Sequence, residues 1–512
     1  MACTFCGVRD PSSIFKKLVL NSTLISDLSR TADSAVVGGF CFRDHGQREE
    51  EANLAQVKND FSQGSIPRNI LSLALPMTAA QLVNVLYSVV DRIYLGRLPG
   101  SSHLALTGLG VTIPIVSIIM GLANLCGTGG GPLCSIYRGK GDEEEAENVM
   151  GNSFTLLLLL GAAATAFFLV LKRPILYLFG ASDDTFPYAD DYMTIYLCGT
   201  LFVMIGLGMN PFINAQGFGK TGMFTVVIGA VINIVLDPIF IFLMDMGVKG
   251  AALATVIAQG VSAVWVLQFL TGRRSILKLR RRCLPLQGKR VRRIIALGLS
   301  GFCMNMTNSL VQVVCNATLQ FYGGDLYVGI MTIINSVREV FFMPVHGLTN
   351  GSQPVMGYNY GAGKYGRVRQ SIRFGCGLTV AYAAAFWALA MAFPGLMIQI
   401  FNDEPEVIQA GIPALRIYFA LFIPMSLQSA GQAVFVALGR SKQAVFFSLL
   451  RKAIINAPLT VILPIWIGTN GVFIAEAVSQ LVGGLACFVT MYCTVYRPLG
   501  RLKDDTPLPA RR

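Results

Sequence analysis

The chain has 512 residues, of which 53% are hydrophobic and only 13% are charged, and its formal net charge is +13. The apolar residues come in long blocks, a pattern that argues against a soluble protein and indicates an integral membrane protein. Much of the positive charge is concentrated in RRSILKLRRR (273–282) and KRVRR (289–293). These runs contain no interleaved aromatic residues for base stacking, so nucleic-acid binding is not expected.

Residues 1–56 are polar and mixed in charge, and they lack the positive-then-apolar pattern of a secretory signal, so we expect a disordered tail. Cys3 and Cys6 form an isolated CxxC pair, which is weak evidence for zinc without a second pair of ligands. After the first residue, no methionine precedes Met77. Because bacterial translation can start at a valine codon, we favour a start at Val57 over a regulatory tail. Removal of residues 1–56 should then leave export unchanged.

A helix of about 20 apolar residues spans a bilayer, and the sequence contains twelve such stretches. Their approximate limits are 69–95, 105–131, 151–171, 191–214, 221–244, 251–271, 294–321, 328–352, 371–393, 412–436, 444–467 and 472–496. We predict an all-α integral membrane protein with two six-helix lobes. The N-lobe takes residues 57–272, a basic linker 273–293, the C-lobe 294–496 and a cytoplasmic tail 497–512.

Lysine and arginine residues in the connections predict the orientation of the chain, because these residues are retained on the cytoplasmic side of the membrane. The connections after even-numbered spans carry 18 of them, whereas those after odd-numbered spans carry 4. Both termini and the basic linker are therefore expected on the cytoplasmic side of the cell membrane.

A motif of glycine and proline occurs twice, once in each predicted lobe. It has the pattern GxxPxxxxxxGxG and consists of Gly129, Pro132, Gly139 and Gly141, and again of Gly351, Pro354, Gly361 and Gly363. The segment GAALATVIAQ (250–259) likewise matches GVFIAEAVSQ (471–480). Since each repeat holds an even number of spans, both have the same orientation in the membrane. Parallel repeats of this kind usually place a binding cavity between two lobes.

The segment GFGKTG (217–222) raises the alternative of a phosphate-binding loop, and with it an enzyme or an ATP-driven pump. Such a loop needs a glycine where this chain has Asn214, and it follows a strand rather than a membrane helix. We therefore predict a tight turn at Gly217 and Gly219, and no nucleotide binding.

Asp237 is the only charged residue in its predicted span, 221–244. A rise of 1.5 Å per residue places it roughly 10 Å from the outer end of that helix. The next residue, Pro238, is expected to kink the helix and to leave the carbonyl of Ile234 without its donor. We assign Pro238 as a hinge.

Three further oxygen-bearing side chains fall at a similar depth: Asn233 one turn deeper than Asp237 on the same face, Asp91 in the first span and Thr255 in the sixth. Two nearby carboxylates in an apolar medium cannot both be ionised cheaply unless a proton or a metal ion joins them. We therefore favour a cation-coupling site. The alternatives are a structural aspartate pair, or Asp91 paired with the adjacent Arg92.

Three segments and the repeated motif form a recognisable pattern: PMTAAQLVNVLYSVVDRIYLG (76–96), INIVLDPIF (232–240) and GYNYGAGKYGRV (357–368). Over roughly residues 60–500 the chain resembles the multidrug and toxic compound extrusion family, in its prokaryotic DinF-like branch. The resemblance implies a twelve-helix antiporter that exports organic cations and other amphiphilic drugs in exchange for inward Na⁺ or H⁺. It also implies a cation site at Asp91, Asn233, Asp237 and Thr255.

The repeat predicts that the C-lobe lacks a matching cation site. In the C-lobe, Cys315 stands at the position equivalent to Asp91, Leu459 at that of Asp237 and Glu476 at that of Thr255. Arg338, Glu339 and Arg451 also lie near the middle of the membrane. We favour ion pairing between helices, such as Glu339 with Arg451, over a direct role of these charges in drug or proton binding.

Polar residues at helical spacing form candidates for the lining of the cavity, although hydrogen bonding between helices is an equal alternative. They are Gln81, Asn84, Asn305, Asn308, Gln312 and Asn316.

The leading hypothesis is a secondary transporter, and not an enzyme, that couples drug export to H⁺ or Na⁺. We expect small amphiphilic or cationic substrates, the lipid bilayer as its surroundings, a monomeric state and no cofactor. If Na⁺ is the coupling ion, the metal would bind at the four residues of the predicted cation site. The alternatives are a flippase or exporter of a lipid-linked or metabolite substrate, and a membrane scaffold or receptor.

Overall fold

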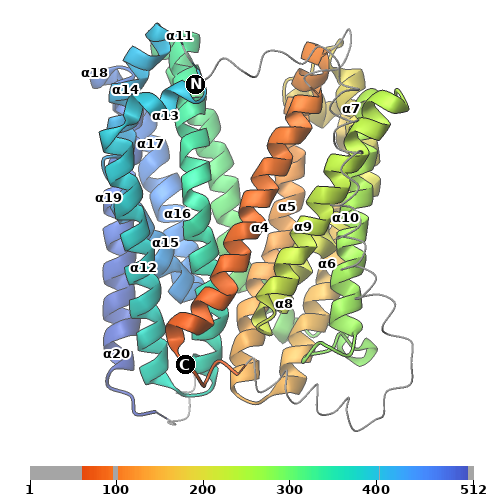
Figure 1. Ribbon diagram of the computed structural model, residues 1–512, viewed down its shortest axis with the longest axis vertical. Coiled ribbons are helices and arrows are strands. Elements are labelled where there is room, and N and C mark those ends of the chain that lie inside the picture. The colour runs from red at the N-terminus through yellow and green to blue at the C-terminus, as the bar shows by residue number, and fades with distance from the viewer. Residues whose placement is uncertain (1–59, 96–101, 403, 505–512) are drawn as a thin grey trace, which may run out of the picture. The chain divides into compact units, whose positions relative to one another are not determined.

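The computed structural model describes residues 60–95, 102–402 and 404–504 (Figure 1). These residues are almost entirely helical and contain no strand, which confirms the predicted all-α class. The predictions for the tail at 1–56, including Cys3, Cys6 and the start at Val57, lie outside the described residues.

The N-lobe is built from seven α-helices in its described part, because the predicted fourth span is broken in two. The elements are α4 (Ile66–Leu95), α5 (Ser102–Gly139), α6 (Glu143–Leu178), α7 (Phe186–Cys198), α8 (Thr200–Ala215), α9 (Gly219–Pro238), the π-helical turn η2 (Ile239–Leu243) and α10 (Gly247–Thr271). α7 and α8 meet at Gly199 with a bend of 58°. The N-lobe core buries Ile115 of α5, Leu157 of α6 and Val266 of α10.

The C-lobe begins with one long helix that contains two predicted spans. Its elements are α11 (Gly288–Gly361), α12 (Tyr365–Ala392), α13 (Pro394–Gln399), α14 (Pro405–Phe419), α15 (Phe422–Ala437), α16 (Ser441–Leu449), the π-helical turn η4 (Leu450–Asn456), α17 (Ala457–Ile462), α18 (Pro464–Ile467), α19 (Asn470–Met491), the π-helical turn η5 (Tyr492–Tyr496) and α20 (Arg497–Leu499). α11 is interrupted at Gly324, whose φ of 64° and ψ of −163° suit glycine alone. The break falls between the predicted spans 294–321 and 328–352.

The number of membrane spans agrees only approximately with the prediction of twelve. In the described residues, nine helices are long and apolar enough to cross a membrane, or up to eleven if each bent pair is one span. This count takes α11 as one helix, although its 74 residues amount to about 110 Å. The bent pair α14 and α15, with an angle of 43°, replaces the predicted straight span 412–436.

Local sequence signals set several helix boundaries. Asp142 caps α6 by accepting a hydrogen bond from the backbone N–H of Glu145 at 3.0 Å, and three glutamates follow in the first turn. Between α8 and α9, Gly217 has a φ of 92°, a left-handed conformation that favours glycine. The GFGKTG segment therefore lies at a turn between two helices, where no strand precedes it.

The basic linker is anchored to the N-lobe. Glu147 of α6 accepts a hydrogen bond from the backbone N–H of Lys278 at 3.0 Å and forms an ion pair with Arg280 at 3.1 Å. Asn152, one and a half turns further along α6, donates to the backbone carbonyls of Cys283 and Pro285, both at 3.1 Å. These contacts give the linker a defined path along α6. Its predicted role as an orientation signal stays a prediction.

The repeated glycine motif lies where the two lobes meet. A side chain on Gly139 of α5 would collide with the backbone of Tyr358 in α11, and one on Gly361 of α11 would collide with the backbone of Ile136 in α5. These two contacts are equivalent under the repeat. The last glycine of each motif has a left-handed φ, 75° at Gly141 and 72° at the corresponding turn after α11. Each motif thus provides close helix crossing and then a turn.

The segment that precedes α4, Asp60–Gly64, is held against the C-lobe. Arg367 of α12 donates to the backbone carbonyls of Phe61, Gln63 and Gly64 at 3.0 to 3.1 Å. Asn359 of α11 also donates to the carbonyl of Phe61, at 3.0 Å. Both C-lobe residues belong to the GYNYGAGKYGRV segment, so this part of the pattern connects the start of the N-lobe to the C-lobe.

Candidate functional site

Three of the predicted site residues form a buried hydrogen-bonded group in the N-lobe. Asn233 and Asp237 lie one turn apart on α9, and Thr255 faces them from α10. When the Asn233 amide nitrogen donates to Asp237 Oδ2 at 2.9 Å, the amide oxygen accepts from the backbone N–H of Thr255 at 3.2 Å. This orientation satisfies both ends of the amide. Asn233 therefore connects α9 to α10 beside a fully buried carboxylate.

Asp91 of α4 is the fourth predicted member of the group. α4 packs alongside α9 (Figure 1), and the carboxylates of Asp91 and Asp237 are close enough to interact electrostatically. Two ionised carboxylates in this surrounding repel each other, and a bound proton or cation relieves the repulsion. The structure therefore places Asp91 on the helix next to the hydrogen-bonded group of Asn233, Asp237 and Thr255.

Two tyrosines that the sequence analysis missed complete the surroundings of the carboxylates. Tyr87, one turn before Asp91 on α4, interacts electrostatically with both aspartates and shares a side-chain hydrogen bond with Thr255. Tyr192 of α7 interacts with the same two carboxylates. The spacing of four residues from Asp91 could have identified Tyr87, whereas nothing in the sequence connects Tyr192 to the site.

The donor atoms of this group suit a small hard cation as well as a proton. They are carboxylate, hydroxyl and amide oxygens, the ligands that Na⁺ and other hard cations prefer. Among the described residues, no group of three or more His, Cys, Asp or Glu side chains could hold a metal ion. A cation bound here would have two carboxylates and neutral oxygens as its ligands.

The helix geometry changes at the predicted hinge. α9 ends at Pro238, and the next five residues form the π-helical turn η2. Proline cannot donate to the carbonyl four residues earlier, so a change of hydrogen-bonding pattern at this point is expected. The predicted role as a hinge stays a prediction.

The polar residues proposed for the cavity lining fall into two groups. Gln81 and Asn84 are exposed on α4. On α11, Gln312 donates to Asn316 at 3.1 Å and accepts from Asn335 at 3.1 Å. Since Asn335 lies beyond the break at Gly324, this contact supports the alternative of hydrogen bonding between helices for part of the stripe. Its other members, Asn305 and Asn308, are half-buried.

The C-lobe contains a counterpart of the N-lobe group, with one shift of register. Asn456 donates to Glu476 and accepts from Thr460 at 3.2 Å, as Asn233 bridges two partners in the N-lobe. The sulfur of Cys315 lies 3.9 Å from the hydroxyl of Thr460. The contacts thus make Thr460 the counterpart of Asp237, and the predicted counterpart Leu459 is wrong by one residue.

The predicted ion pair between Glu339 and Arg451 is also wrong. Arg451 and the adjacent Lys452 instead pair with Glu476, at 3.5 and 3.0 Å. All three side chains are nearly inaccessible, whereas Glu339 is exposed. The prediction paired these residues by their depth along the helices, and depth does not determine the direction in which a side chain points from its helix.

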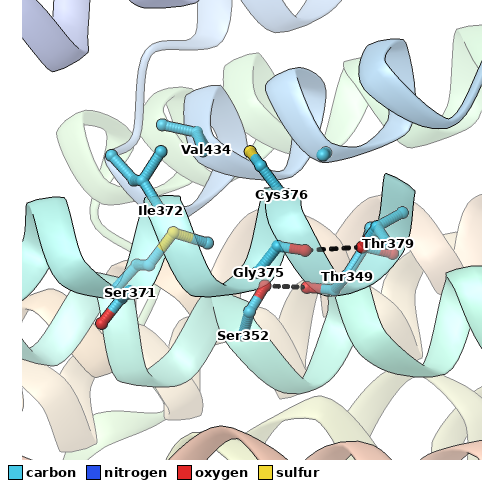
Figure 2. A pocket seen from close by; sticks show the side chains of 10 residues that line it. Thr349, Ser352, Ser371, Ile372, Gly375, Cys376, Thr379 and Val434 are labelled. Carbon is cyan, nitrogen blue, oxygen red and sulfur yellow. Dashed lines mark hydrogen bonds between the residues drawn. The ribbon is translucent and has the colours of Figure 1, made fainter. Parts of the chain in front are cut away.

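A small cavity in the C-lobe lies between α11, α12 and α15 (Figure 2). Its hydroxyl groups are satisfied within their own helices: Ser352 donates to the carbonyl of Thr349, and Thr379 to that of Gly375, both at 2.8 Å. The cavity therefore offers no free polar group to a ligand, and we interpret it as a gap in helix packing.

Comparison with known proteins places this geometry in a family. The MatE family model matches residues 76–239 and 302–462, one segment in each lobe. Multidrug export protein MepA of Staphylococcus haemolyticus (strain JCSC1435) is 25% identical over 450 residues, covering 87% of this chain and 96% of its own. MepA of Staphylococcus aureus (strain NCTC 8325 / PS 47) is 24% identical over 439 residues, covering 84% and 95%.

Solved structures show the same fold. The outward-facing conformation of a multidrug resistance MATE family transporter of the MOP superfamily is similar, with a TM-score of 0.80 and 22% identity, covering 86% of this chain and 98% of that one. A MATE structure in the bent conformation gives a TM-score of 0.81 at 22% identity, covering 88% and 98%. The family model spans more than half of the sequence, which confirms the predicted resemblance. The chain belongs to the MatE family of multidrug and toxic compound extrusion transporters, which are secondary transporters and not enzymes.

Proposed function

We propose that this protein is a cation-coupled antiporter, which exports amphiphilic or cationic compounds across the cytoplasmic membrane in exchange for inward H⁺ or Na⁺. The observation that carries the proposal is the pair of carboxylates, Asp91 and Asp237, on neighbouring helices of the N-lobe. Among the described ion pairs, none joins a lysine or arginine to Asp237. Asp237 thus has no lysine or arginine partner among the described residues, and a transported cation can take that place.

The relatives support the direction of transport, since two of them are named as multidrug export proteins. Energy for export can come from the coupling ion, because one charge moving across the membrane is worth about 2.3 kcal/mol per 100 mV. A cation changes the balance between conformations only if it binds one of them more tightly. The two carboxylates provide this difference in cation affinity if the distance between them changes when α4 or α9 moves.

The same charges explain how ion and drug can exchange. With both carboxylates ionised, the N-lobe attracts a cationic compound, because opposite charges interact strongly in an apolar surrounding. Binding of a proton or Na⁺ cancels part of this attraction. The affinity for the drug then falls on the side of the membrane where the coupling ion enters.

The test replaces Asp237 by asparagine, which keeps the size of the side chain but cannot be ionised. We expect Asp237→Asn to abolish ion-driven accumulation of a cationic dye by inverted vesicles, in which export is directed inward, while the protein stays folded in the membrane. The matched control is Asp245→Asn, an exposed aspartate just after η2, which should export normally. Unimpaired export by Asp237→Asn would refute the assignment.

Asp91→Asn should have the same effect as Asp237→Asn, because one remaining carboxylate can no longer share a cation with its partner. In vesicles with wild-type protein, a protonophore should dissipate export if H⁺ is the coupling ion, and removal of Na⁺ should do so if Na⁺ is. Export that survives both treatments would contradict cation coupling and favour a flippase.

We also propose a monomer in the cytoplasmic membrane with both termini on the cytoplasmic side. The orientation is supported by the distribution of lysine and arginine: the connections after even-numbered spans carry 18 of them, and those after odd-numbered spans carry 4. Labelling of single cysteines with an impermeant reagent in intact cells tests the orientation. Reaction of a cysteine placed in the basic linker would contradict it.

A further inference from the structure

The middle of the C-lobe holds more positive than negative charge. Three basic side chains surround a single buried carboxylate, Glu476. We call Arg338, Arg451 and Lys452 the C-lobe basic cluster. Glu476 already accepts hydrogen bonds from Lys452, Arg451 and Asn456. Its two carboxylate oxygens are therefore occupied as acceptors.

One other carboxylate stands near the cluster and does not neutralise it. Glu339 interacts electrostatically with Arg338, but it is exposed and forms no ion pair with any described basic residue. Even when Glu339 is counted, three cations face two carboxylates. His346, which also lies near Arg338, adds no negative charge. A surplus cation within a membrane span is costly, and such residues usually serve a function.

Two buried polar groups at the cluster donate to no acceptor among the described residues. They are Nε of Arg451, in a residue that is 7% exposed, and the hydroxyl of Tyr418, in a fully buried residue that lies within hydrogen-bonding reach of Arg338. Tyr418 of α14 lies beside both Arg338 and Arg451. Buried groups of this kind normally find a partner, so their convergence points to an acceptor that the chain itself does not supply.

Within the cluster, Arg338 is the member that a ligand can reach. The side chains of Arg451 and Lys452 are only 9% and 5% exposed, whereas Arg338 is partly exposed on α11. Asn335 lies one turn earlier on the same helix, and its carbonyl oxygen also has no partner among the described residues. Arg338 therefore belongs to a partly accessible, polar strip of the C-lobe.

We propose that the C-lobe basic cluster is an anion-binding site, in which Arg338 binds a carboxylate of the exported compound. A guanidinium is suited to this task because it can donate two parallel hydrogen bonds to one carboxylate. This inference rests on the proposed export function and specifies its substrates. The transporter takes zwitterionic amphiphiles, with their cationic group toward the N-lobe carboxylates and their carboxylate toward Arg338.

The test uses two dyes that differ only in this charge, tetramethylrhodamine with its free carboxylate and its methyl ester. Their binding to the purified full-length protein is measured by fluorescence anisotropy. In Arg338→Gln we expect the dissociation constant of the free acid to rise about tenfold, as for the loss of a charge-assisted hydrogen bond, while that of the ester stays unchanged. Arg338→Lys should restore part of the affinity for the acid.

Two further variants keep the test decisive. Arg373→Gln makes the same change at an exposed arginine of α12 and should alter the binding of neither dye. Tyr418→Phe removes only the hydroxyl beside Arg338, and it should weaken binding of the acid alone if that hydroxyl donates to the anion. If Arg338→Gln does not fold, Arg338→Lys and Tyr418→Phe supply the comparison.

The outcomes separate this site from the export function. An equal loss for acid and ester in Arg338→Gln, or no loss for either, would overturn the anion site. A second contradicting result is that wild type and Arg338→Gln bind the acid equally well, while wild type binds and exports the ester. This result would overturn the anion site and leave the export function intact. Wild-type protein that exports neither dye would count against the export function itself.

Discussion

The two lobes place different chemistry on equivalent positions of one helical scaffold. In the N-lobe, Asp91 and Asp237 interact electrostatically from neighbouring helices, whereas in the C-lobe Cys315 and Thr460 occupy the corresponding places. The carboxylate of the C-lobe comes instead from α19, at Glu476, and basic residues surround it. Repetition of a fold thus preserved the contacts between helices, while the charges diverged.

Small residues explain how each lobe accommodates its own set of charges. The register of the contacts, 223 residues, aligns Gly229 of α9 with Lys452. In the N-lobe, the space beside Gly229 is filled by Ser262, so this position holds no counterpart of the Lys452 ammonium group. In the C-lobe, Gly483 leaves room for the stem of Arg451. A buried carboxylate with its own cations is already neutralised, and one without them is available for an exchangeable cation.

The largest effect is expected from Glu476→Gln. The change leaves Arg451 and Lys452 buried without their carboxylate, which costs about 3 to 5 kcal/mol of stability. Ion-dependent export should persist in the folded fraction, because the proposed cation site lies in the N-lobe. The melting temperature in detergent and efflux from vesicles are the measurements.

The control for this change is Glu339→Gln, which alters an exposed glutamate and should leave the melting temperature nearly unchanged. A Glu476→Gln protein that is as stable as wild type, but has lost all dependence on the ion, would move the coupling site to the C-lobe.

Arg367→Gln should have the next largest effect. It removes hydrogen bonds to three backbone carbonyls of the segment before α4, and the shorter side chain cannot replace them. Hydrogen bonds from a charged donor contribute about 1.5 to 3 kcal/mol, so we expect a loss of about 2 kcal/mol. The drop in melting temperature should exceed that of the exposed control Arg373→Gln, and equal values would show that the contact does not stabilise the protein.

Depth along a helix could be predicted, and three of the residues it grouped, Asn233, Asp237 and Thr255, are connected by hydrogen bonds in the structure, with Asp91 on a neighbouring helix. A helix rises by a constant amount per residue, so the level of a side chain follows from the ends of the span. The direction of a side chain around the axis does not follow from level alone. This is why Glu339 was matched to Arg451, although Glu476 is the actual partner.

Irregular helix segments limited the remaining predictions. The π-helical turn η4 precedes Thr460, and a helix with one residue more per turn shifts every later position. An offset of 222 residues, taken from the glycine motif, therefore pointed to Leu459. The break at Gly199 was missed because a single glycine within an apolar run resembles an ordinary span. Tyr192 was missed because a tyrosine in a membrane helix carries no charge signal.

A pair of threonine variants sharpens the comparison between the lobes. Thr255→Val removes a hydroxyl that contacts Asn233 in the cation site, at 3.3 Å. The loss of one hydrogen bond, about 1 kcal/mol, should raise the ion concentration for half-maximal export about fivefold. Thr460→Val makes the same change at the C-lobe counterpart of Asp237 and should leave the ion dependence unaltered. Equal shifts for both variants would contradict the assignment of coupling to the N-lobe.

The smallest effect concerns pH and the contact between the chain's first described residues and the C-lobe. Burial acts to raise the pKa of Asp60, but hydrogen bonds from Ser62, one of them from its backbone N–H at 2.8 Å, lower the pKa below its ordinary value of 3.8. A carboxyl with a depressed pKa stabilises the folded protein above its unfolded pKa, and this contribution is lost as pH falls through the folded pKa. The melting temperatures of wild type and Asp60→Asn should therefore differ slightly at neutral pH and converge below pH 3.8. Asp184→Asn, at an exposed aspartate of the N-lobe, serves as the control. A difference that instead grows as the pH is lowered would have the opposite sign and would exclude Asp60 as a stabilising anion.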